Sequence, residues 1–353
     1  MTSNAVVFDV PELSTSGHAV ACEARAGLTR TPKSLSPWLF YDETGSELFE
    51  QITRVPEYYL TRTERQLFEA HSVAILREMG FDAVGTQTAD GTKHPLRLQN
   101  AVTVAELGAG TATKTGILLR ALASAQPSVV YQPIDVSVSA LDHAKKLEAQ
   151  IAGISVRPCV ANYVAEEYQI ERTPRTRVLA LYIGSSIGNF APEEAQAVLT
   201  RLSAQLKPGD GLLLGTDLAP GRHKPVEQLC AAYDDARGVT SAFNRNVLTR
   251  LNRELGSDFA IEKFDHVAMW NPDKSRMEMH LKSVTSQVVT IPANSAGPAA
   301  TIHFRPGETI HTENSYKFTR KRVAQLLSSA GFQPAKTFVD ERGLFALTLA
   351  KIM

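Results

Sequence analysis

The segment AELGAGTATKT at residues 105–115 has the residue types of a ligand-binding turn, because it places glycines directly after a short apolar run. Gly108 and Gly110 allow the backbone to turn sharply and to approach a ligand closely. The G-x-G-x-x-G pattern of nicotinamide-binding enzymes is incomplete, since Thr113 stands where the last glycine belongs. The segment predicts a nucleotide-like ligand, with a tight structural turn as the plain alternative.

Two charged residues near this turn narrow the choice of ligand. Asp135 ends the next apolar run, where an acidic side chain can accept hydrogen bonds from both hydroxyls of a ribose. Lys114 falls in the first helical turn, where its charge opposes the helix dipole, so a ligand carboxylate would explain it better. S-adenosylmethionine has a ribose, a carboxylate and no phosphate, and it fits these features. A nicotinamide cofactor is the competing ligand.

A second strand-end motif, YIGSSIGN at residues 182–189, contains the G-x-S-x-G pattern of serine hydrolases around Ser186. In those enzymes a helix starts directly at the serine. Here several residues, ending in Pro192, delay the helix. The motif therefore favours a loop that carries Asn189 toward a ligand over a serine hydrolase site.

The nine histidines show no HExxH or comparable spacing, so the sequence predicts no metal site. His280 is expected to be a solvated or core histidine. By residue type alone, Glu278 and Glu313 are surface charges. The plain interpretation of four tyrosines is that they fill a core or an interface: Tyr41, Tyr58, Tyr59 and Tyr233.

Short apolar runs alternate with amphipathic segments through the middle of the chain. Expected strands lie at 102–107, 129–135, 154–160 and 177–184, with a fifth after the turn at 208–210. Expected helices lie at 114–123, 138–151 and 192–205. This alternation predicts a doubly wound parallel sheet, that is, an α/β fold.

The alternation stops after residue 219, where two helices are expected at 226–235 and 240–254. Strand-like runs then follow at 264–270, 276–284, 286–291 and 300–304. The last 36 residues predict a helix and an antiparallel hairpin that close the first sheet. We expect one domain from residues 63–218 and 318–353, and a substrate-binding lobe from 20–62 and 219–317. Ligands should bind between them, at the carboxyl ends of the strands.

Three further expectations concern the N-terminal third. Thr61 and Glu64 match a capping box that opens a helix to about Met79. Residues 1–20 are expected to be loosely ordered, and the polar stretch 85–100 to form a surface loop.

Composition excludes several classes of protein. The 353 residues are 43% hydrophobic and carry equal numbers of acidic and basic side chains, so a general nucleic-acid binder is excluded. Three cysteines far apart in the chain indicate reduced thiols and no disulfide framework. We find no signal peptide and no membrane-spanning run. The expected protein is cytoplasmic, with no membrane or nucleic-acid partner, and a monomer is favoured.

Several long motifs resemble the histidine N-alpha-methyltransferases of ergothioneine biosynthesis, from about residue 20 to near the end. They include RAGLTRTPKSLSPWLFYDETGSELFEQITRVPEYYLTRTE, ELGAGTATKT, YIGSSIGNF, GDGLLLGTDL, AAYDDARGVTSAFNRNVLTRLNREL, WNPDKSRMEMHL and ETIHTENSYKF. The resemblance implies a class I methyltransferase fold with a second, substrate-recognition lobe. It also implies transfer of three methyl groups from S-adenosylmethionine to the α-amino group of L-histidine, giving hercynine, without a metal.

The resemblance also implies roles for individual residues. Residues implied to bind S-adenosylmethionine are Gly108, Lys114 and Asp135, with Asn162 and Tyr163 near the adenine. Residues implied to hold the amino and carboxylate groups of histidine are Tyr58, Asn189 and Tyr233, with Tyr41 lining the site. Residues implied to read the imidazole are Glu313, Ser315 and Met279. Tyr58 and Asn189 are the candidates for a polar network that lets the amine lose its proton to solvent.

One departure concerns the cofactor side, and two alternative functions stay open. The family often has Asp-Phe where this chain has Asn162-Tyr163; an asparagine carbonyl can still accept a bond from the adenine amino group. The alternatives are a methyltransferase for another amino acid such as tryptophan, and a catalytically silent binding protein of the same fold.

Overall fold

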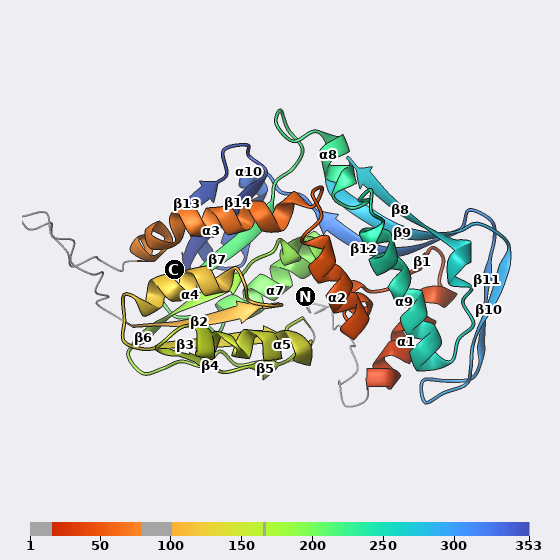
Figure 1. The fold of residues 1–353 in the computed structure, drawn as a ribbon, viewed down its shortest axis with the longest axis horizontal. Helices are drawn as coiled ribbons and strands as arrows, with labels where there is room; N and C mark the ends of the chain where they lie inside the picture. The colour runs from red at the N-terminus through yellow and green to blue at the C-terminus, as the bar shows by residue number, and fades with distance from the viewer. Residues whose placement is uncertain (1–15, 80–100, 165–166, 353) are drawn as a thin grey trace, which may run out of the picture.

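The computed structural model describes residues 16–79, 101–164 and 167–352. The expected loop at 85–100 lies outside these residues. Within the described ranges, no helix has the length and apolar character needed to cross a membrane. Figure 1 shows two lobes side by side, each built around its own sheet.

The larger lobe contains an eight-stranded sheet in the order β13-β14-β7-β6-β2-β3-β4, with β5 also paired to β3. Its strands are β2 (Ala101–Leu107), β3 (Val129–Asp135), β4 (Ile154–Val156), β5 (Cys159–Val160), β6 (Thr176–Tyr182), β7 (Gly211–Asp217), β13 (Phe332–Val339) and β14 (Phe345–Ile352). The central strands are parallel, and β14 runs antiparallel to both β7 and β13. This is the predicted doubly wound sheet with a terminal hairpin.

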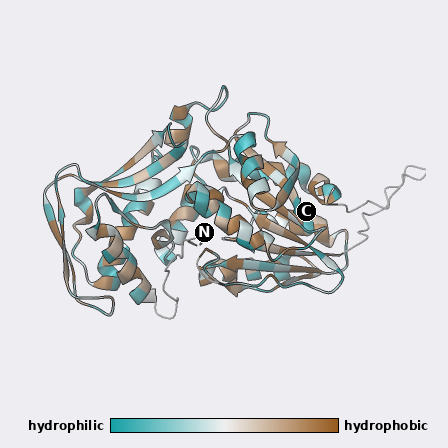
Figure 2. Ribbon diagram, turned by 180° about the vertical axis from the view of Figure 1, so that it is seen from behind, coloured by the Kyte–Doolittle hydropathy of each residue, from teal (hydrophilic) through white to brown (hydrophobic). Residues whose placement is uncertain are grey.

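Helices cover both faces of the larger sheet, because its buried parallel strands are apolar on both sides. One face packs against α3 (Tyr59–Glu78), α4 (Thr115–Ala123) and α5 (Val138–Lys145), which leads into the short α6 (Leu147–Gln150). The other face packs against α7 (Pro192–Ser203) and α10 (Arg320–Ser329). Figure 2 shows apolar positions on the elements of both lobes.

The smaller lobe packs a four-stranded sheet, in the order β1-β12-β9-β8, against helices. Its strands are β1 (Lys33–Ser34), β8 (Phe264–Asn271), β9 (Arg276–Ser283) and β12 (Thr309–Tyr316), with a separate pair β10 (Gln287–Ile291) and β11 (Ala300–Phe304). Its helical elements are α1 (Ser16–Thr29), η1 (Pro37–Phe40), α2 (Glu43–Ile52), α8 (Val226–Ala231), α9 (Val239–Leu255) and η3 (Ile261–Lys263). Apolar side chains of these elements form one continuous core.

Two of the places where the chain passes between the lobes lie side by side. Phe318 donates its backbone N–H to the carbonyl of Asp217 at 2.9 Å, and Ala219 donates to the carbonyl of Phe318 at 2.9 Å. The end of β7 is thereby fixed to the segment after β12. This junction places the carboxyl end of the larger sheet against the smaller one.

The predicted capping box at Thr61 is wrong. The helix α3 begins at Tyr59, and its N-cap residue, Tyr58, makes no side-chain capping bond. Thr61 therefore lies inside the first turn. Glu64 does not reach back to the helix start, because its buried carboxylate binds Lys114 and the backbone N–H of Gly184.

Four other expectations need correction. Residues 16–20, predicted to be loose, begin helix α1, whose Val20 and Ala24 are buried in the core of the smaller lobe. The predicted strand 154–160 is two short strands, because Pro158 has no N–H to donate to a ladder. The helix predicted at 138–151 is divided into α5 and α6, and the one predicted at 226–235 ends at Ala231.

Candidate functional site

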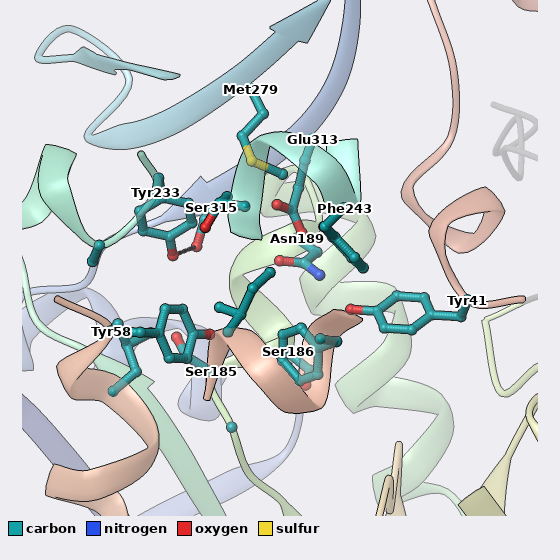
Figure 3. Close-up of a pocket in the computed structure, with 16 residues that line it drawn as sticks. Tyr41, Tyr58, Ser185, Ser186, Asn189, Tyr233, Phe243, Met279, Glu313 and Ser315 are labelled. Atoms are coloured by element: carbon teal, nitrogen blue, oxygen red, sulfur yellow. Dashed lines mark hydrogen bonds between the residues drawn. The ribbon is translucent and has the colours of Figure 1, made fainter. Parts of the chain in front are cut away.

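A pocket opens between the two lobes, at the carboxyl ends of the larger sheet's strands, with about 540 Å³ of space including the part open to solvent. Every side chain that the sequence assigned to the substrate lines it: Tyr41, Tyr58, Asn189, Tyr233, Met279, Glu313 and Ser315. Figure 3 shows them converging from both lobes.

Strands β9 and β12 carry the polar and apolar side chains of one pocket wall. Met279 and Glu313 are register partners across these strands, so they face the same side of the sheet. Ser315 follows two residues later on β12 and also lines the pocket. The expectation that Glu313 is a surface charge is wrong, because β12 turns it toward the pocket instead of toward solvent.

Burial raises the pKa of Glu313 to about 7, although the nearby ammonium of Lys317 pulls the pKa down. A carboxyl group with this pKa changes charge near neutral pH. When ionised it can accept an N–H from a ligand, and when protonated it can donate. An apolar ligand would leave the carboxylate without a partner.

Lys317 ties two of the substrate-facing hydroxyls together. Its fully buried ammonium donates to Tyr233 Oη at 2.7 Å and to Ser315 Oγ at 2.8 Å, and these two oxygens lie 2.7 Å apart. The same ammonium pairs with Asp217 Oδ2 at 2.8 Å. Lys317 therefore fixes the rotamers of Tyr233 and Ser315 against the end of β7.

Asp217 is the centre of this buried network. Lys224 pairs with its Oδ1 at 2.5 Å, and Tyr59 donates to both of its oxygens at 3.0 Å. Burial alone would raise the pKa of Asp217, but the two lysines outweigh burial and lower it. Because Asp217 stays ionised and paired with two cations, it anchors the wall instead of serving as a base.

Three tyrosines give the pocket neutral hydroxyl groups. Burial is the largest cause that raises the pKa of Tyr41, Tyr58 and Tyr233 well above the usual value. Each is therefore a hydrogen-bonding phenol at neutral pH. After burial, the charge of Glu313 is the next cause that raises the pKa of Tyr41, and the charge of Asp135 adds to it.

The loop after β6 brings Asn189 to the pocket through η2 (Ser186–Asn189). A Cβ atom at Gly188 would lie 2.8 Å from the carbonyl oxygen of Tyr316, so only glycine allows β12 to pack this closely. Ser186 donates its hydroxyl to the carbonyl of Ile183 at 3.2 Å. That bond leaves Ser186 as part of the loop structure, not as an activated nucleophile.

The glycine-rich turn has the shape that a nucleotide ligand needs. Gly108 and Gly110 have φ angles of +66° and +51°, and a Cβ at Gly108 would lie 3.2 Å from Tyr163 Oη. Asp135 accepts the N–H of Gly110 at 3.0 Å and that of Ser137 at 2.9 Å. Burial raises the pKa of Asp135, while these backbone bonds lower it. The turn, Asp135 and Tyr163 thus lie together, beside the substrate pocket.

Lys114 and Asn162, near the glycine-rich turn, interact with neighbouring groups of the protein. Lys114 is the N-cap residue of α4, and its ammonium pairs with the buried carboxylate of Glu64 next to Gly184 of the pocket. Asn162 accepts the backbone N–H of Val164 at 3.2 Å. The sequence did not anticipate Glu64 in this position, which holds the ammonium of Lys114 at the edge of the pocket.

Residues that the sequence analysis missed are mostly inward-facing charges: Glu64, Asp217, Lys224 and Lys317. One signal was available, since Lys317 follows Glu313 and Ser315 at the same spacing of two. For Asp217 and Lys224 the sequence gives no such signal, because their pairing depends on the junction between the lobes.

Comparisons with known proteins identify the family of this chain. The family described as histidine-specific, S-adenosylmethionine-dependent methyltransferases matches residues 20–352. This chain belongs to that family. The histidine N-alpha-methyltransferase of Mycolicibacterium smegmatis is 40% identical over 334 residues, which cover 94% of each chain. The enzyme of that name from Mycobacterium tuberculosis is 39% identical over 336 residues, 95% of each chain.

A more distant relative is ergothioneine biosynthesis protein 1 of Schizosaccharomyces pombe, 26% identical over 304 residues. The match covers 84% of this chain and 36% of that protein. Membership of the methyltransferase family confirms the class I methyltransferase fold and the dependence on S-adenosylmethionine. The serine hydrolase and nicotinamide alternatives are thereby excluded.

A stability measurement can test the burial of Glu313 in this histidine-specific methyltransferase. An unfolded glutamate ionises near 4.5, whereas burial raises the folded pKa to about 7. Unfolding therefore releases a proton between these values, and the folded state loses stability as pH rises from 4.5 to 7. We compare the free energy of unfolding of Glu313→Gln with that of wild type, both without substrate. The difference in favour of the variant should be about 2–3 kcal/mol larger at pH 8 than at pH 5. Urea unfolding at both pH values measures this; the exposed Glu262→Gln is the control. Equal differences at both pH values would contradict a buried carboxyl group with a raised pKa.

Proposed function

We propose that the protein transfers three methyl groups from S-adenosylmethionine to the α-amino group of L-histidine, giving hercynine for ergothioneine biosynthesis. The observation that carries this proposal is the wall on which Glu313, Ser315 and Met279 lie together in the pocket. Its carboxylate and hydroxyl match the two ring nitrogens of an imidazole, and its thioether matches the apolar ring edge. The names of the relatives support histidine as substrate.

On this proposal, the amino and carboxylate groups of histidine lie between Tyr58, Asn189 and Tyr233. Tyr233 is held by Lys317, so its position is set before the substrate arrives. Tyr41 is proposed to line the pocket beside the bound histidine. The catalytic contribution of these residues is to hold the amine in line with the methyl donor.

On the cofactor side, Asp135 is proposed to bind the ribose hydroxyls, and Gly108 to let the ligand approach the backbone. Asn162 and Tyr163 are proposed to border the adenine, and Lys114 to bind the carboxylate. When bound, S-adenosylmethionine supplies an activated methyl group on its sulfonium. No metal is needed for that activation.

The amine must lose its proton before each transfer. The phenols of Tyr41 and Tyr58 are neutral and poor bases, because burial raises their pKa. We propose that Tyr58 and Asn189 pass the proton to solvent at the open side of the pocket. No dedicated general base is then required.

Mass spectrometry of the product tests the proposal. With histidine and excess S-adenosylmethionine, the mass should rise in three methyl steps and stop, because a quaternary nitrogen has no lone pair left. Mono- and dimethylhistidine should be accepted as substrates. Fragmentation should place all three methyl groups on the α-nitrogen. A methyl group on the ring would show that the amino group does not lie near Asn189.

We further propose that the enzyme works as a cytoplasmic monomer, with no nucleic-acid or membrane partner. The three cysteines, none of them in a disulfide, suit a reducing compartment. We also propose that residues 63–218 and 318–353 form the cofactor domain and that residues 20–62 and 219–317 form the substrate lobe.

A further inference from the structure

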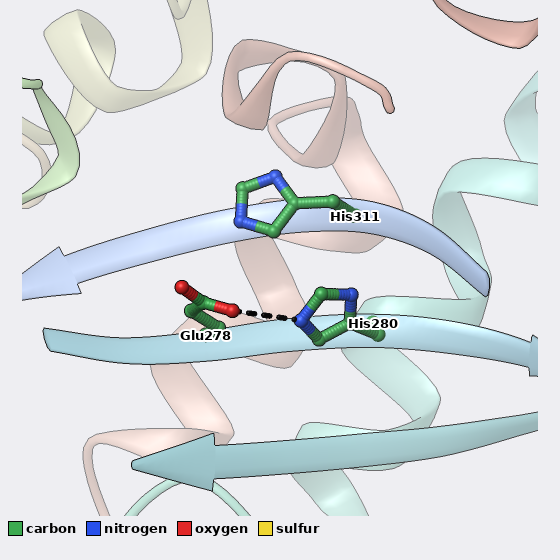
Figure 4. A group of neighbouring side chains, drawn as sticks. All are labelled: Glu278, His280 and His311. Atoms are coloured by element: carbon green, nitrogen blue, oxygen red, sulfur yellow. Dashed lines mark hydrogen bonds and ion pairs between the residues drawn. The ribbon is translucent and has the colours of Figure 1, made fainter. Parts of the chain in front are cut away.

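Three potential metal ligands gather on the smaller sheet, on the face opposite the pocket. Met277, Met279 and Leu281 of β9 point into the lobe's apolar core, so the alternating Glu278 and His280 face the other way. His311 of β12 is the register partner of His280. Figure 4 shows the three side chains on neighbouring strands.

A β-bulge explains why His311 does not face the pocket. The register of β12 against β9 shifts between His311 and Glu313. In a regular strand these two side chains would share a face. The extra residue at the bulge reverses that relation, so that Glu313 pairs with Met279 and His311 pairs with His280.

The spacing of the donor atoms suits a metal ion. One ligand atom from each of the three residues lies within 4.8 Å of the others. Glu278 Oε2 and His280 Nε2 are 3.2 Å apart. Zinc bonds nitrogen and oxygen at about 2.0–2.2 Å, which places neighbouring ligands roughly 3–3.5 Å from each other. The first pair already has this separation, and His311 offers a third ligand atom within 4.8 Å of both.

Neighbouring groups orient the ligands as they do in metal sites. Arg276 Nε and Asn271 Nδ2 both donate to Glu278 Oε1, at 2.7 and 2.9 Å, which leaves Oε2 directed at His280. Asn314 holds the ring of His311 through a 2.9 Å bond. Such outer partners fix the orientation of ligating carboxylates and histidines. Among the described side chains, His280 Nδ1 is buried and has no hydrogen-bond partner.

We propose that Glu278, His280 and His311 bind one divalent transition-metal ion of the zinc class, which bridges β9 and β12. The donor set, two imidazoles and one carboxylate, suits Zn²⁺ and its neighbours Co²⁺ and Ni²⁺. For Nε2 of His280 to bind the metal, the neutral ring must carry its proton on Nδ1. The charge of Arg276 beside Glu278 weakens the site but does not occupy Oε2.

The proposed metal site shares its two strands with the pocket wall. Because the same strands carry Met279 and Glu313 on their other face, a bound ion would also stabilise the pocket wall.

Metal titration of the tag-free full chain, freed of metal by a chelator, tests this site. Calorimetry with Zn²⁺ should show one ion per chain, and the melting temperature should rise with Zn²⁺. His280→Ala and His311→Ala should each weaken Zn²⁺ binding at least 10-fold. His303→Ala, at an exposed position of the same lobe, should bind like wild type. Circular dichroism checks that each variant is folded.

A second place on the chain could also take zinc and needs its own control. Cys22 Sγ lies 3.5 Å from His18 Nε2. With wild-type protein, Co²⁺ bound at the proposed site should give a nitrogen–oxygen ligand-field spectrum without a thiolate charge-transfer band, and Cys22→Ser should keep full affinity. A thiolate band, loss of binding in Cys22→Ser, or unchanged affinity in both histidine variants would each overturn the proposal. Absence of any Zn²⁺ binding to wild type would do the same.

Discussion

The double variant Glu313→Ala/Met279→Val should lose most of its activity on histidine and gain measurable methylation of tryptophan. Removing the carboxylate takes a charged hydrogen bond from the imidazole, which costs about 2–3 kcal/mol. This corresponds to a fall in kcat/KM of roughly 30- to 150-fold. Steady-state rates at pH 8, where the carboxyl of Glu313 is ionised, give the value.

The gain on tryptophan has a separate physical reason. In wild type, an indole would leave the buried carboxylate of Glu313 without an adequate partner, and that penalty rejects it. Shortening Met279, which is 2% exposed, makes room for the larger ring. Met279→Val alone should keep most of the activity on histidine. The control Glu262→Ala should not change the activity on histidine or on tryptophan. Near-normal histidine turnover by the double variant would show that this wall does not recognise the side chain of the substrate.

Asp135→Asn should weaken S-adenosylmethionine binding about 10- to 150-fold. A charge-assisted hydrogen bond contributes roughly 1.5–3 kcal/mol, and the amide can replace only one of the two acceptor oxygens. Asparagine is preferable to alanine here, because its oxygen can still accept the N–H of Gly110 that closes the turn.

Calorimetry with S-adenosylmethionine measures this loss directly. Asp142→Asn, an exposed position on α5, is the matched control and should bind like wild type. Thermal unfolding of the ligand-free variants shows whether the turn survives. Unchanged affinity in a folded Asp135→Asn protein would remove Asp135 from the ribose site.

The larger sheet could be predicted because its buried parallel strands are nearly continuous apolar runs. Each run ends at a turn that the sequence also marks, as at Gly108 and Asp135. In the smaller lobe, the strands β8, β9, β10 and β11 were also predicted to within one residue, but helix α1 was missed because its apolar stripe is weak. The boundaries of the third strand were wrong because the break at Pro158 was not recognised as an interruption of the ladder.

The residues of the pocket could also be predicted only in part from the sequence. Residue types and motifs suggested Glu313, Ser315 and Met279, but not what holds them. Lys317 and Asp217 come together only where the chain passes between the lobes, 100 residues apart in sequence. Glu64 matched a capping pattern, yet its carboxylate lies inward against Gly184. Buried ion pairs of this kind are set by tertiary structure, so a local pattern cannot predict them.

The bulge in β12 also kept the sequence from predicting how the histidines are grouped. Spacing along one strand gave no metal pattern, because the three ligands are divided between β9 and β12. His311 and Glu313 are two residues apart, so simple alternation would place them on one face. The register shift places them on opposite faces. Only the paired strands show that one residue faces the pocket and the other faces Glu278.

The central claim, that this pocket selects histidine, is tested most directly by one competition experiment. The purified protein is given S-adenosylmethionine and all twenty amino acids together at equal concentration, and the products are separated by mass. The account predicts that trimethylated histidine is formed and that every other amino acid keeps its mass. Preferential methylation of another amino acid, or no methylation at all from a protein that binds S-adenosylmethionine, would contradict it.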